Sequence, residues 1–314
     1  MKKFYTLSLF LISFIGFSQV SLPFADSFSY TAGNLHTTNP WSVVGTPNAT
    51  DHILLNGSNV TFDGIGTDAQ VLFTSQTAGT VYYKFKLKVL TMAGVSDANG
   101  GYLAGFTQNT TTFGGTIWTK RVDDNTFNIG IETRTATGVS TTYTTGTYNT
   151  GTSYTVVVSY TFNSATTADD TAKLWINPTS TDETSPLLTD VHTGTDLTSI
   201  VSFFLRQDSI TETPSVEIDD LKISLTFADV LKSSKFENIA GLSIYPNPVS
   251  NGTLFINTDA NDEKSVSIFD VLGKQVLQLT TSNNAINVAN LNGGIYIVKV
   301  TENGKTATRK LVIK

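Results

Sequence analysis

The sequence predicts an all-β protein: an antiparallel jelly-roll sandwich followed by a small Ig-like β-sandwich. Apolar and polar residues alternate in two long runs, and many shorter runs of the same kind follow. Most gaps between the runs hold Gly, Asn, Asp, Thr or Pro, and no segment beyond residue 18 shows a helical period. The length of 314 residues allows one large or two modest domains.

The composition excludes several classes of function. The chain has no cysteine, so it forms no disulfide, thiolate nucleophile or Cys-ligated zinc site. Residues 19–229 carry nine Lys and Arg against twenty Asp and Glu, a net charge of −11, whereas residues 242–314 carry seven against five, a net of +2. An acidic domain lacks the basic face that nucleic acid requires, so we expect no nucleic-acid partner. It remains compatible with glycans or divalent cations.

The first eighteen residues predict a secretory signal peptide. Met1, Lys2 and Lys3 give a positive start, and an apolar run extends from Phe4 to Phe17. This run is too short to span a membrane and is followed by polar sequence, so we expect cleavage after Ser18. No later segment approaches spanning length, and we therefore expect no membrane span once the signal peptide is removed.

Residues 19–230 are predicted to form one domain. Its clearest strand is Thr80–Leu90, where apolar side chains face one way and Lys84, Lys86 and Lys88 the other. Ser153–Phe162 repeats this alternation. Shorter candidate strands are His52–Leu55, Val60–Phe62, Val71–Thr74, Tyr102–Phe106, Thr116–Lys120, Phe127–Glu132, Ala172–Ile176, Ile200–Arg206 and Val216–Phe227. So many strands at such intervals predict a two-sheet jelly roll.

Three short motifs in this domain match a known fold family. They are Phe28-Ser-Tyr30-x-x-Gly33-x-Leu35 with Trp41, then Leu174-Trp-Ile-Asn-Pro178, then Val216-x-Ile218-Asp219-x-Leu221 running on to Phe227-Ala-Asp229. They resemble the concanavalin-type (laminin-G-like) jelly rolls of exported bacterial proteins. The resemblance implies the fold and no single function, because this fold carries lectins, hydrolases, lyases and spacers.

Residues 231–241 are the predicted linker, and a series of short strands follows it. Leu242–Tyr245 alternates and stops at Pro246, since proline removes a ladder donor. Further strands are predicted at Leu254–Ile256, Val266–Phe269, Val276–Leu279, Ile286–Val288, Ile295–Val300 and Arg309–Lys314. Seven strands in this length predict a small antiparallel sandwich over residues 242–314.

Four blocks within residues 242–314 occur in the order and spacing of a known family. Their residues are Tyr245, Pro246, Asn247 and Pro248, then Asp270, Gly273 and Lys274, then Gly294 and Tyr296, and finally Lys310 and Leu311. They resemble the type A C-terminal sorting domain of the type IX secretion system of Bacteroidetes. The resemblance implies two partners, the type IX translocon and its sortase-like processing enzyme. It also implies export through the periplasm to the outer cell surface or the medium, with the sorting domain cleaved near the linker.

Glu217-Ile-Asp219 is the candidate catalytic motif. It looks like half of the motif of jelly-roll glucanases, in which two glutamates flank an aspartate and retaining chemistry needs carboxyl groups about 5 Å apart. The second glutamate is missing, because Leu221 and Lys222 occupy the expected positions, and the motif lies on the domain's last strand rather than a central one. We therefore assign no catalytic residue, and Glu217 and Asp219 remain the alternative. The non-catalytic interpretation is a closing strand with a register break at the aspartate pair.

The sequence predicts no definite cofactor, and a structural calcium ion is the candidate. Asp26 and Asp219 would meet if the first and last strands pair, and their oxygens are ligands that calcium prefers. The turns Asp97–Gly101 and Asp123–Asn125 are also oxygen-rich, although each alone fits a solvated Asx turn. The three histidines, His36, His52 and His192, are scattered, and no pair has metal-ligand spacing in the sequence.

Aromatic residues are the candidate glycan-binding groups, because sugar rings pack their C–H faces on aromatic planes. Trp118 has polar neighbours and lies near Arg121, so Trp118, Tyr102 and Arg121 are the candidates for ligand binding. Trp41 and Trp175 are the other large aromatics considered. For any of them the alternative is burial in the sandwich core.

Three hypotheses remain for the large domain. The leading one is a non-catalytic module that binds glycan or matrix, because no complete catalytic set is present. The alternative is a polysaccharide-degrading hydrolase or lyase that uses Glu217 and Asp219. The third is a structural or adhesive surface protein with sugar-coated Thr-rich faces. Whether the protein is an enzyme is left open by the sequence.

Overall fold

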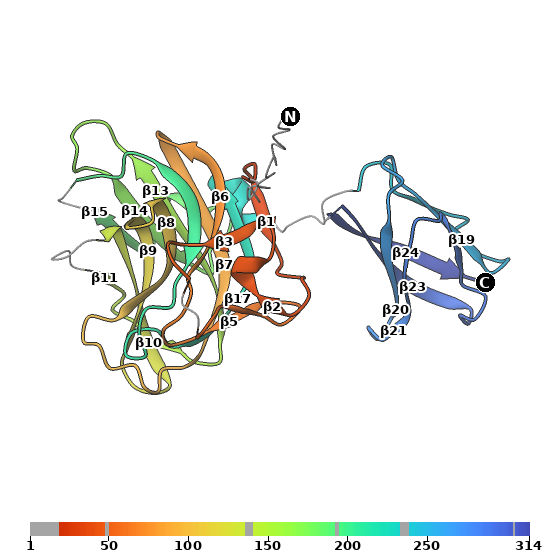
Figure 1. The fold of residues 1–314 in the computed structure, drawn as a ribbon, viewed down its shortest axis with the longest axis horizontal. Coiled ribbons are helices and arrows are strands. Elements are labelled where there is room, and N and C mark those ends of the chain that lie inside the picture. The colour runs from red at the N-terminus through yellow and green to blue at the C-terminus, as the bar shows by residue number, and fades with distance from the viewer. Residues whose placement is uncertain (1–18, 48–49, 136–140, 192–194, 233–238, 304) are drawn as a thin grey trace, which may run out of the picture. The chain divides into compact units, whose positions relative to one another are not determined.

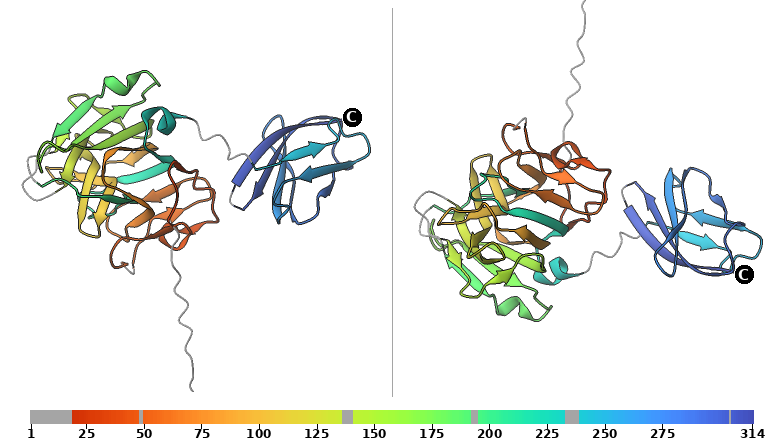
Figure 2. Two further views of the ribbon diagram at one scale, coloured as in Figure 1. Left: turned by 90° about the horizontal axis from the view of Figure 1, so that it is seen from above. Right: turned by 90° about the horizontal axis from the view of Figure 1, so that it is seen from below.

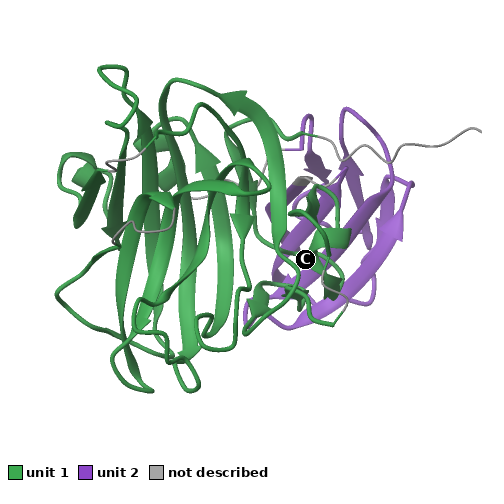
Figure 3. Cartoon of the chain, turned by 60° about the vertical axis from the view of Figure 1, so that its left-hand side comes forward, with its two compact units in different colours: residues 1–232 green, residues 233–314 purple. Residues whose placement is uncertain are grey.

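The computed structural model describes residues 19–47, 50–135, 141–191, 195–232, 239–303 and 305–314. The chain forms two compact units, residues 1–232 and 233–314 (Figure 3). The predicted signal peptide, residues 1–18, lies outside the described part. Among the described residues, no helix is long and apolar enough to cross a membrane.

Two antiparallel sheets make up the first unit, as the views in Figures 1 and 2 show. The nine-stranded sheet runs in the order β15 (Leu188–Val191), β14 (Thr171–Ile176), β13 (Ser153–Phe162), β7 (Gly79–Thr91), β17 (Ser215–Ser224), β5 (Val60–Phe62), β4 (Leu54–Leu55) and β2 (Gly33–Asn34), and β1 (Phe24–Asp26) pairs with β17. The eight-stranded sheet runs in the order β11 (Thr142–Tyr143), β10 (Thr126–Thr135), β9 (Thr112–Arg121), β8 (Gly101–Asn109), β16 (Ile200–Leu205), β6 (Ala69–Gln76) and β3 (Trp41–Val43), and β12 (Tyr148–Asn149) pairs with β10. The predicted jelly-roll sandwich is confirmed.

Alternation along the strands decides which side chains fill the core between the sheets. Tyr83, Phe85 and Leu87 of β7 are fully buried there, together with Phe106 of β8 and Phe203 of β16. Tyr83 and Phe203 pack with ring centroids 5.0 Å apart. Because successive side chains of a strand point to opposite faces, the residues between these core positions emerge on the outer faces of the sandwich.

The position of β17 differs from the expectation. Although β17 is the last strand of the unit in sequence, it lies inside the nine-stranded sheet, between β7 and β5. The predicted register break is present between Asp219 and Lys222, where Asp220 adopts a positive φ of 54°. The strand also ends earlier than predicted, at Ser224.

A short helix, α1 (Phe227–Leu231), replaces the end of the predicted strand. The Thr226 side chain accepts a hydrogen bond from the backbone N–H of Asp229, which starts the helix. Phe227 and Val230 of α1 are buried against Tyr82, Val157 and Trp175 on the outer face of the nine-stranded sheet. The remaining helical turns of the described chain are η1 (Leu35–Thr37) and η2 (Asp182–Thr184).

The second unit is a small β-sandwich with its own core. One sheet runs β18 (Ser243–Tyr245), β19 (Thr253–Asn257) and β22 (Ala285–Asn287), and the other runs β21 (Gln275–Thr281), β20 (Lys264–Asp270), β23 (Gly294–Glu302) and β24 (Lys305–Ile313). Its seven strands agree with the sequence prediction. Both ends of the predicted linker, residues 231–241, belong to folded parts of the chain. Leu231 is the last residue of α1, and Ile239 is buried in this second core.

Most residues of the four sequence blocks in the second unit have structural roles. Asn247 clamps the last strand: its side chain donates to the carbonyl oxygen of Lys310 (2.7 Å) and accepts from the N–H of Val312 (2.9 Å). Tyr296 and Leu311 are buried in the core. The other block residues lie at or beside β18, at the turn after β20, at the start of β23 and on β24, and they are Tyr245, Pro246, Pro248, Asp270, Gly273, Lys274, Gly294 and Lys310.

Candidate functional site

The outer face of the eight-stranded sheet carries the candidate site, on strands β8, β9, β10 and β16. We call it the aromatic face and define it by Tyr102, Phe113, Trp118, Phe204, Arg206 and Glu132. Trp118, Phe204 and Glu132 lie opposite the core positions of their strands, as alternation requires. Tyr102 and Phe113 are each four residues from a core residue of the same strand, Phe106 and Ile117, and they belong to this face because the register between β8 and β9 shifts. Register brings them together: Tyr102 pairs with Trp118, and Glu132 pairs with Thr116.

The floor of this face is a small aromatic cluster separate from the main core. Tyr102 contacts Trp118 with ring centroids 5.0 Å apart, and Phe113 contacts Phe204 at 4.9 Å. The Arg206 guanidinium lies 4.3 Å above the centre of the Tyr102 ring, a cation–π geometry. Phe204 is fully covered by these neighbours, whereas Tyr102 and Trp118 stay partly exposed.

Glu132 is a buried carboxyl at one side of the aromatic face. Only 2% of its surface is exposed. One oxygen, Oε1, accepts a 2.7 Å hydrogen bond from the Thr141 hydroxyl, and the other, Oε2, is buried without a partner among the described residues. Burial raises the pKa of Glu132 to about 7, partly opposed by the nearby hydroxyls of Thr141 and Thr135. Near neutral pH this carboxyl is therefore divided between its acid and its carboxylate form.

Arg206 lies on the aromatic face away from Glu132, and its guanidinium already contacts two carboxylates. Its Nη2 lies 2.6 Å from an oxygen of Asp208, and Nη1 lies 4.0 Å from Asp68. Its Nε is buried without a partner in the described part of the chain. Burial raises the pKa of Asp68 to about 6, even though Arg206 lies near.

Two tyrosine hydroxyls accompany these charged groups. Among the described residues the Tyr102 hydroxyl has no hydrogen-bond partner, and burial raises its pKa while Arg206 opposes that rise. The Tyr143 hydroxyl donates to the carbonyl oxygen of Asn99 (2.5 Å), and burial raises its pKa as well. The charge of Glu132 also raises the pKa of both tyrosines, so the three groups lie near one another.

Of the predicted ligand-binding residues, the structure brings two together and separates the third. Trp118 and Tyr102 are neighbours on the aromatic face. Arg121 instead lies at the end of β9, where it forms a 2.8 Å ion pair with Asp124. The other tryptophans are buried: Trp41 lies in the main core, and Trp175 lies beneath α1.

Glu217 and Asp219 lie on the other sheet, among lysines. Glu217 is 3.9 Å from Lys88, and an Asp219 oxygen accepts a hydrogen bond from the Asp220 N–H (2.6 Å). Burial raises the pKa of Asp219, and Lys86 opposes that rise. Neither side chain belongs to the aromatic face.

The candidate calcium ligands are used in hydrogen bonds. β1 pairs with β17 as anticipated, and Asp26 lies opposite Leu221. The buried Asp26 carboxylate accepts from the N–H of Phe28 (2.7 Å), the Tyr30 hydroxyl (2.9 Å) and the Trp41 indole N–H (2.8 Å). The oxygen-rich turns are Asx turns: Asp97 accepts from the Asn99 N–H and Asp123 from the Asn125 N–H.

Two further groupings were not visible in the sequence. Carboxylates of Asp169, Asp170 and Asp196 lie within 4.8 Å of one another, and most of their oxygens accept hydrogen bonds from their own loops. The rings of His36 and His52 are 4.9 Å apart, although the sequence suggested scattered histidines. Burial and the second ring lower the pKa of His36. In the described chain no third metal-ligand side chain joins this pair.

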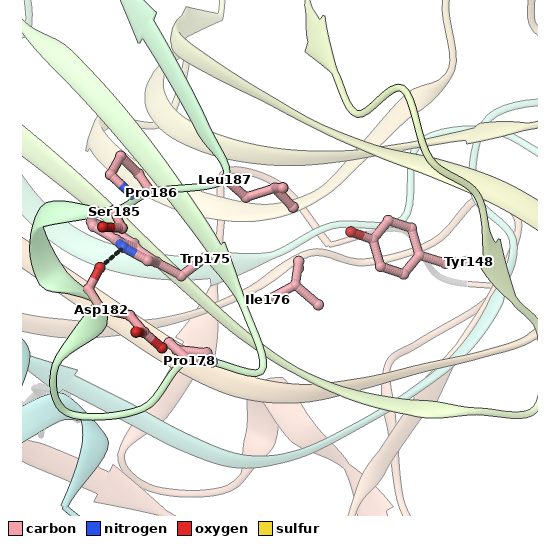
Figure 4. Close-up of a pocket in the computed structure, with 8 residues that line it drawn as sticks. All are labelled: Tyr148, Trp175, Ile176, Pro178, Asp182, Ser185, Pro186 and Leu187. Atoms are coloured by element: carbon pink, nitrogen blue, oxygen red, sulfur yellow. Dashed lines mark hydrogen bonds between the residues drawn. The ribbon is translucent and has the colours of Figure 1, made fainter.

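A pocket of about 450 Å³ lies at the edge of the nine-stranded sheet (Figure 4). Its lining is mostly apolar and includes Tyr148, Ile176 and Leu187. The Trp175 indole N–H in its wall donates to the backbone oxygen of Asp182 (2.7 Å), so this side chain holds the surrounding loop in place. The lining holds a single carboxyl, that of Asp182, which accepts hydrogen bonds from the Thr179 N–H and hydroxyl.

Sequence reasoning missed Glu132, Arg206, Phe113 and Phe204. A signal for Glu132 existed, because it ends the predicted strand Phe127–Glu132 on the face opposite Phe127, Ile129 and Ile131. Arg206 likewise ends the predicted strand Ile200–Arg206, but its meeting with Tyr102 depends on β16 lying beside β8, which the sequence does not show.

Comparison with known proteins separates the two units. The family model described as the secretion system C-terminal sorting domain matches residues 243–314. A curated relative, ulvan lyase NLR42 of Nonlabens ulvanivorans, is 32% identical over 105 residues, which are 32% of this chain and 19% of the relative. The chain thus spans about a fifth of the length of that relative.

Solved structures resemble the chain only distantly. Alginate lyase Aly36B in complex with alginate tetrasaccharide is 14% identical with a TM-score of 0.40, covering 64% of this chain and 97% of that one. The endo-β-1,4-glucuronan lyase of Trichoderma reesei is 15% identical with a TM-score of 0.38, covering 61% and 90%. The Emp47p carbohydrate recognition domain is 9% identical with a TM-score of 0.35, covering 64% and 96%. Likenesses of this size carry no statement about activity.

The second unit can now be assigned from its sequence blocks, its seven-stranded fold and the matching family model. Residues 243–314 are a type IX secretion system C-terminal sorting domain, and the chain is a cargo protein that this system exports to the cell surface or the medium.

Proposed function

We propose that the first unit binds an acidic polysaccharide on the aromatic face and cleaves it by β-elimination. One observation carries the proposal: the same aromatic-floored surface holds a buried carboxyl, Glu132, whose pKa burial raises to about 7, and a guanidinium, Arg206, and each has a buried polar atom without a partner among the described residues. Unsatisfied buried polar atoms are costly, so a site that keeps two of them is suited to a polar ligand that supplies the missing bonds.

The chemistry of such an elimination divides among three side chains. The Arg206 guanidinium pairs with the uronate carboxylate and stabilises the charge that develops when the proton on C5 is removed. The ionised Glu132 accepts that proton, and the pKa of about 7 suits a general base at neutral pH. As the bond between C4 and the leaving oxygen breaks and the C4–C5 double bond forms, the Tyr102 hydroxyl donates its proton to that oxygen. Trp118 supplies a plane for a neighbouring sugar ring.

This proposal replaces the non-catalytic module as the first hypothesis. Lyase activity is also named for the curated relative, and export by the sorting domain would deliver the enzyme to extracellular polysaccharide. We include the signal peptide over residues 1–18 in the proposal as the first export step. Glu217 and Asp219 have no part in it.

The test is product formation from a panel of uronate-containing polysaccharides. The purified chain is incubated with each polymer, and the ultraviolet absorbance of unsaturated uronate ends is followed. We expect activity on at least one polymer, with Glu132→Gln and Tyr102→Phe each lowering it by at least about 100-fold. Glu217→Gln serves as the matched control and should keep full activity. An active Glu132→Gln variant, or no unsaturated product from any polymer, would overturn the assignment.

A second function is favoured by one specific observation, the pairing of Arg206 with Asp208. A guanidinium already held at 2.6 Å by a carboxylate is less available to a uronate, which favours binding of a neutral glycan without cleavage. In that case the same panel would deplete the protein from solution without product, and Trp118→Ala would abolish the depletion.

A further inference from the structure

The turn that follows β20 presents the most exposed aliphatic side chains among the described residues. Leu272 is 91% exposed and Val271 is 72% exposed, whereas single surface aliphatics elsewhere in the described chain reach at most 71%, at Ile210. Isolated exposed aliphatics are ordinary in soluble proteins, but adjacent ones at a protruding tip are not.

The turn is held in shape by its own side chain and backbone. One oxygen of Asp270 accepts from the N–H of Leu272 (2.9 Å) and from the N–H of Lys274 (3.0 Å). The backbone N–H of Asp270 bonds to the carbonyl oxygen of Lys274, and Gly273 takes a positive φ of 82° that few other residues adopt. The spaced residues Asp270, Gly273 and Lys274 thus fix the direction in which Val271 and Leu272 point.

The apolar surface continues from this turn onto the outer face of the adjoining sheet. Ile295 and Ile297 of β23 are about half exposed, and Phe269 of β20 pairs with Ile297. Asp270, where the turn begins, pairs with Tyr296, the residue between these two isoleucines. The tip and the strand residues therefore form one patch, which we call the apolar tip patch and define as Phe269, Val271, Leu272, Ile295 and Ile297.

Three lysines border this patch. Lys310 of β24 pairs with Ile297, Lys299 follows on the same face of β23, and Lys274 closes the turn. In the described chain none of these lysines forms an ion pair. The carboxylate of Asp270, within the turn, accepts hydrogen bonds from the backbone N–H groups of Leu272 and Lys274.

We propose that the apolar tip patch is the surface by which the sorting domain docks into an apolar groove with an acidic rim on a protein of the export machinery. The domain must be recognised by that machinery, and this is the part of its described surface where exposed aliphatics, a rigid presenting turn and unpaired lysines coincide. Burying Val271 and Leu272 in the groove provides affinity, and Lys274, Lys299 and Lys310 pair with the carboxylates of the rim. The inference is independent of the lyase assignment.

The test is export of the full chain in a type IX secretion host, with protein amounts measured immunologically in periplasmic and extracellular fractions. The double variant Val271→Ser/Leu272→Ser should lower the extracellular fraction at least about tenfold and accumulate in the periplasm, the effect of losing about 1.4 kcal/mol of binding free energy. Val122→Ser/Ile210→Ser, which removes exposed aliphatics from the cargo unit, is the matched control and should be exported normally. Leu272→Met should also be exported normally, because it restores an apolar tip.

The folding of each variant is measured separately, so that a loss of export can be distinguished from a loss of stability. Thermal unfolding of the purified double variant should match the unaltered chain, since both side chains project into solvent. If that variant is destabilised, the single variant Leu272→Gln, which changes only the most exposed side chain, replaces it. Normal export of Leu272→Gln together with Ile297→Thr would overturn the proposal. Loss of export accompanied by an equal loss of binding to anionic phospholipid vesicles would also overturn it, in favour of a membrane surface.

Discussion

Asp26 and Glu132 are both buried carboxyls, but they differ in how many hydrogen bonds their oxygens accept, and this difference indicates different roles. The oxygens of Asp26 accept three donors, from Phe28, Tyr30 and Trp41, which tie the first strand to the core. Glu132 accepts from Thr141 through one oxygen, and its other oxygen has no partner in the part of the chain that the structure describes. A carboxyl whose bonding capacity is filled stabilises the fold, whereas one with an open position can serve a ligand.

The pKa of Glu132 makes stability depend on pH in a predictable direction. Burial raises the pKa from its ordinary value of 4.5 to about 7, so the folded chain retains a proton that the unfolded chain releases between these values. The stability contributed by protonated Glu132 is complete below about pH 4.5 and is lost as the pH rises through 7. The free energy of unfolding falls by about 3 kcal/mol at most over this range. We expect Glu132→Gln to remove this loss, so that the variant gains stability over the unaltered chain between pH 5 and pH 8.

Urea denaturation at a series of pH values measures the effect as the difference between variant and unaltered chain. Taking the difference cancels other titrating groups such as Asp68. Glu217→Gln, a substitution of the same kind on the other sheet, is the control for the Glu-to-Gln replacement itself. Parallel pH profiles for Glu132→Gln and the unaltered chain would contradict a raised pKa at this position.

At the scale of elements, the five-residue helix α1 covers part of the outer face of the nine-stranded sheet. Phe227 is 1% exposed and contacts Tyr82 and Trp175 with ring centroids 5.9 and 5.0 Å apart. We expect Phe227→Ala to lower the free energy of unfolding of the first unit by about 3 kcal/mol, because it leaves a cavity beneath the helix. Leu225→Ala, at a position 46% exposed, should cost no more than about 0.5 kcal/mol. Equal effects in denaturant titrations would show that α1 is not held by this contact.

Single elements were predictable from the sequence where the apolar pattern is long, and unpredictable where neighbours decide. The strands around Tyr83 and Val156 follow from alternation alone. The α1 helix does not, because five residues are too few to show a helical period and Phe227 fits a strand pattern equally well. Trp118 was recognisable as an outward residue from its polar neighbours.

The order of strands within each sheet could not be predicted from the sequence. Insertion of β17 between β7 and β5 made the expected position of Glu217 wrong, and pairing of β16 with β8 created the contact between Arg206 and Tyr102. These pairings join residues between 95 and 158 positions apart. Periodicity describes which face a side chain takes and says nothing about which strand lies alongside.

At the scale of the whole molecule, two separate cores predict two separate unfolding events. The main core is built from residues of the first unit, and the second core is built from Ile239 onward. We propose domain boundaries on this basis and expect the fragments 19–232 and 239–314, produced separately, each to unfold in one cooperative transition. Differential scanning calorimetry of both fragments and of the intact chain measures this. A fragment that lacks a cooperative transition would place the boundary elsewhere.

The three tryptophans of the chain occupy three different surroundings: Trp41 between the sheets, Trp175 beneath α1 and Trp118 on the aromatic face, with none in the sorting domain. Tryptophan fluorescence therefore reports on the first unit and not on the sorting domain, which contains tyrosines but no tryptophan. In a Trp41→Phe/Trp175→Phe background, the remaining indole emits from the surface where the sugar is expected to stack. If a sugar stacks on Trp118 as proposed, this variant would report its binding through its own fluorescence, without a chemical label.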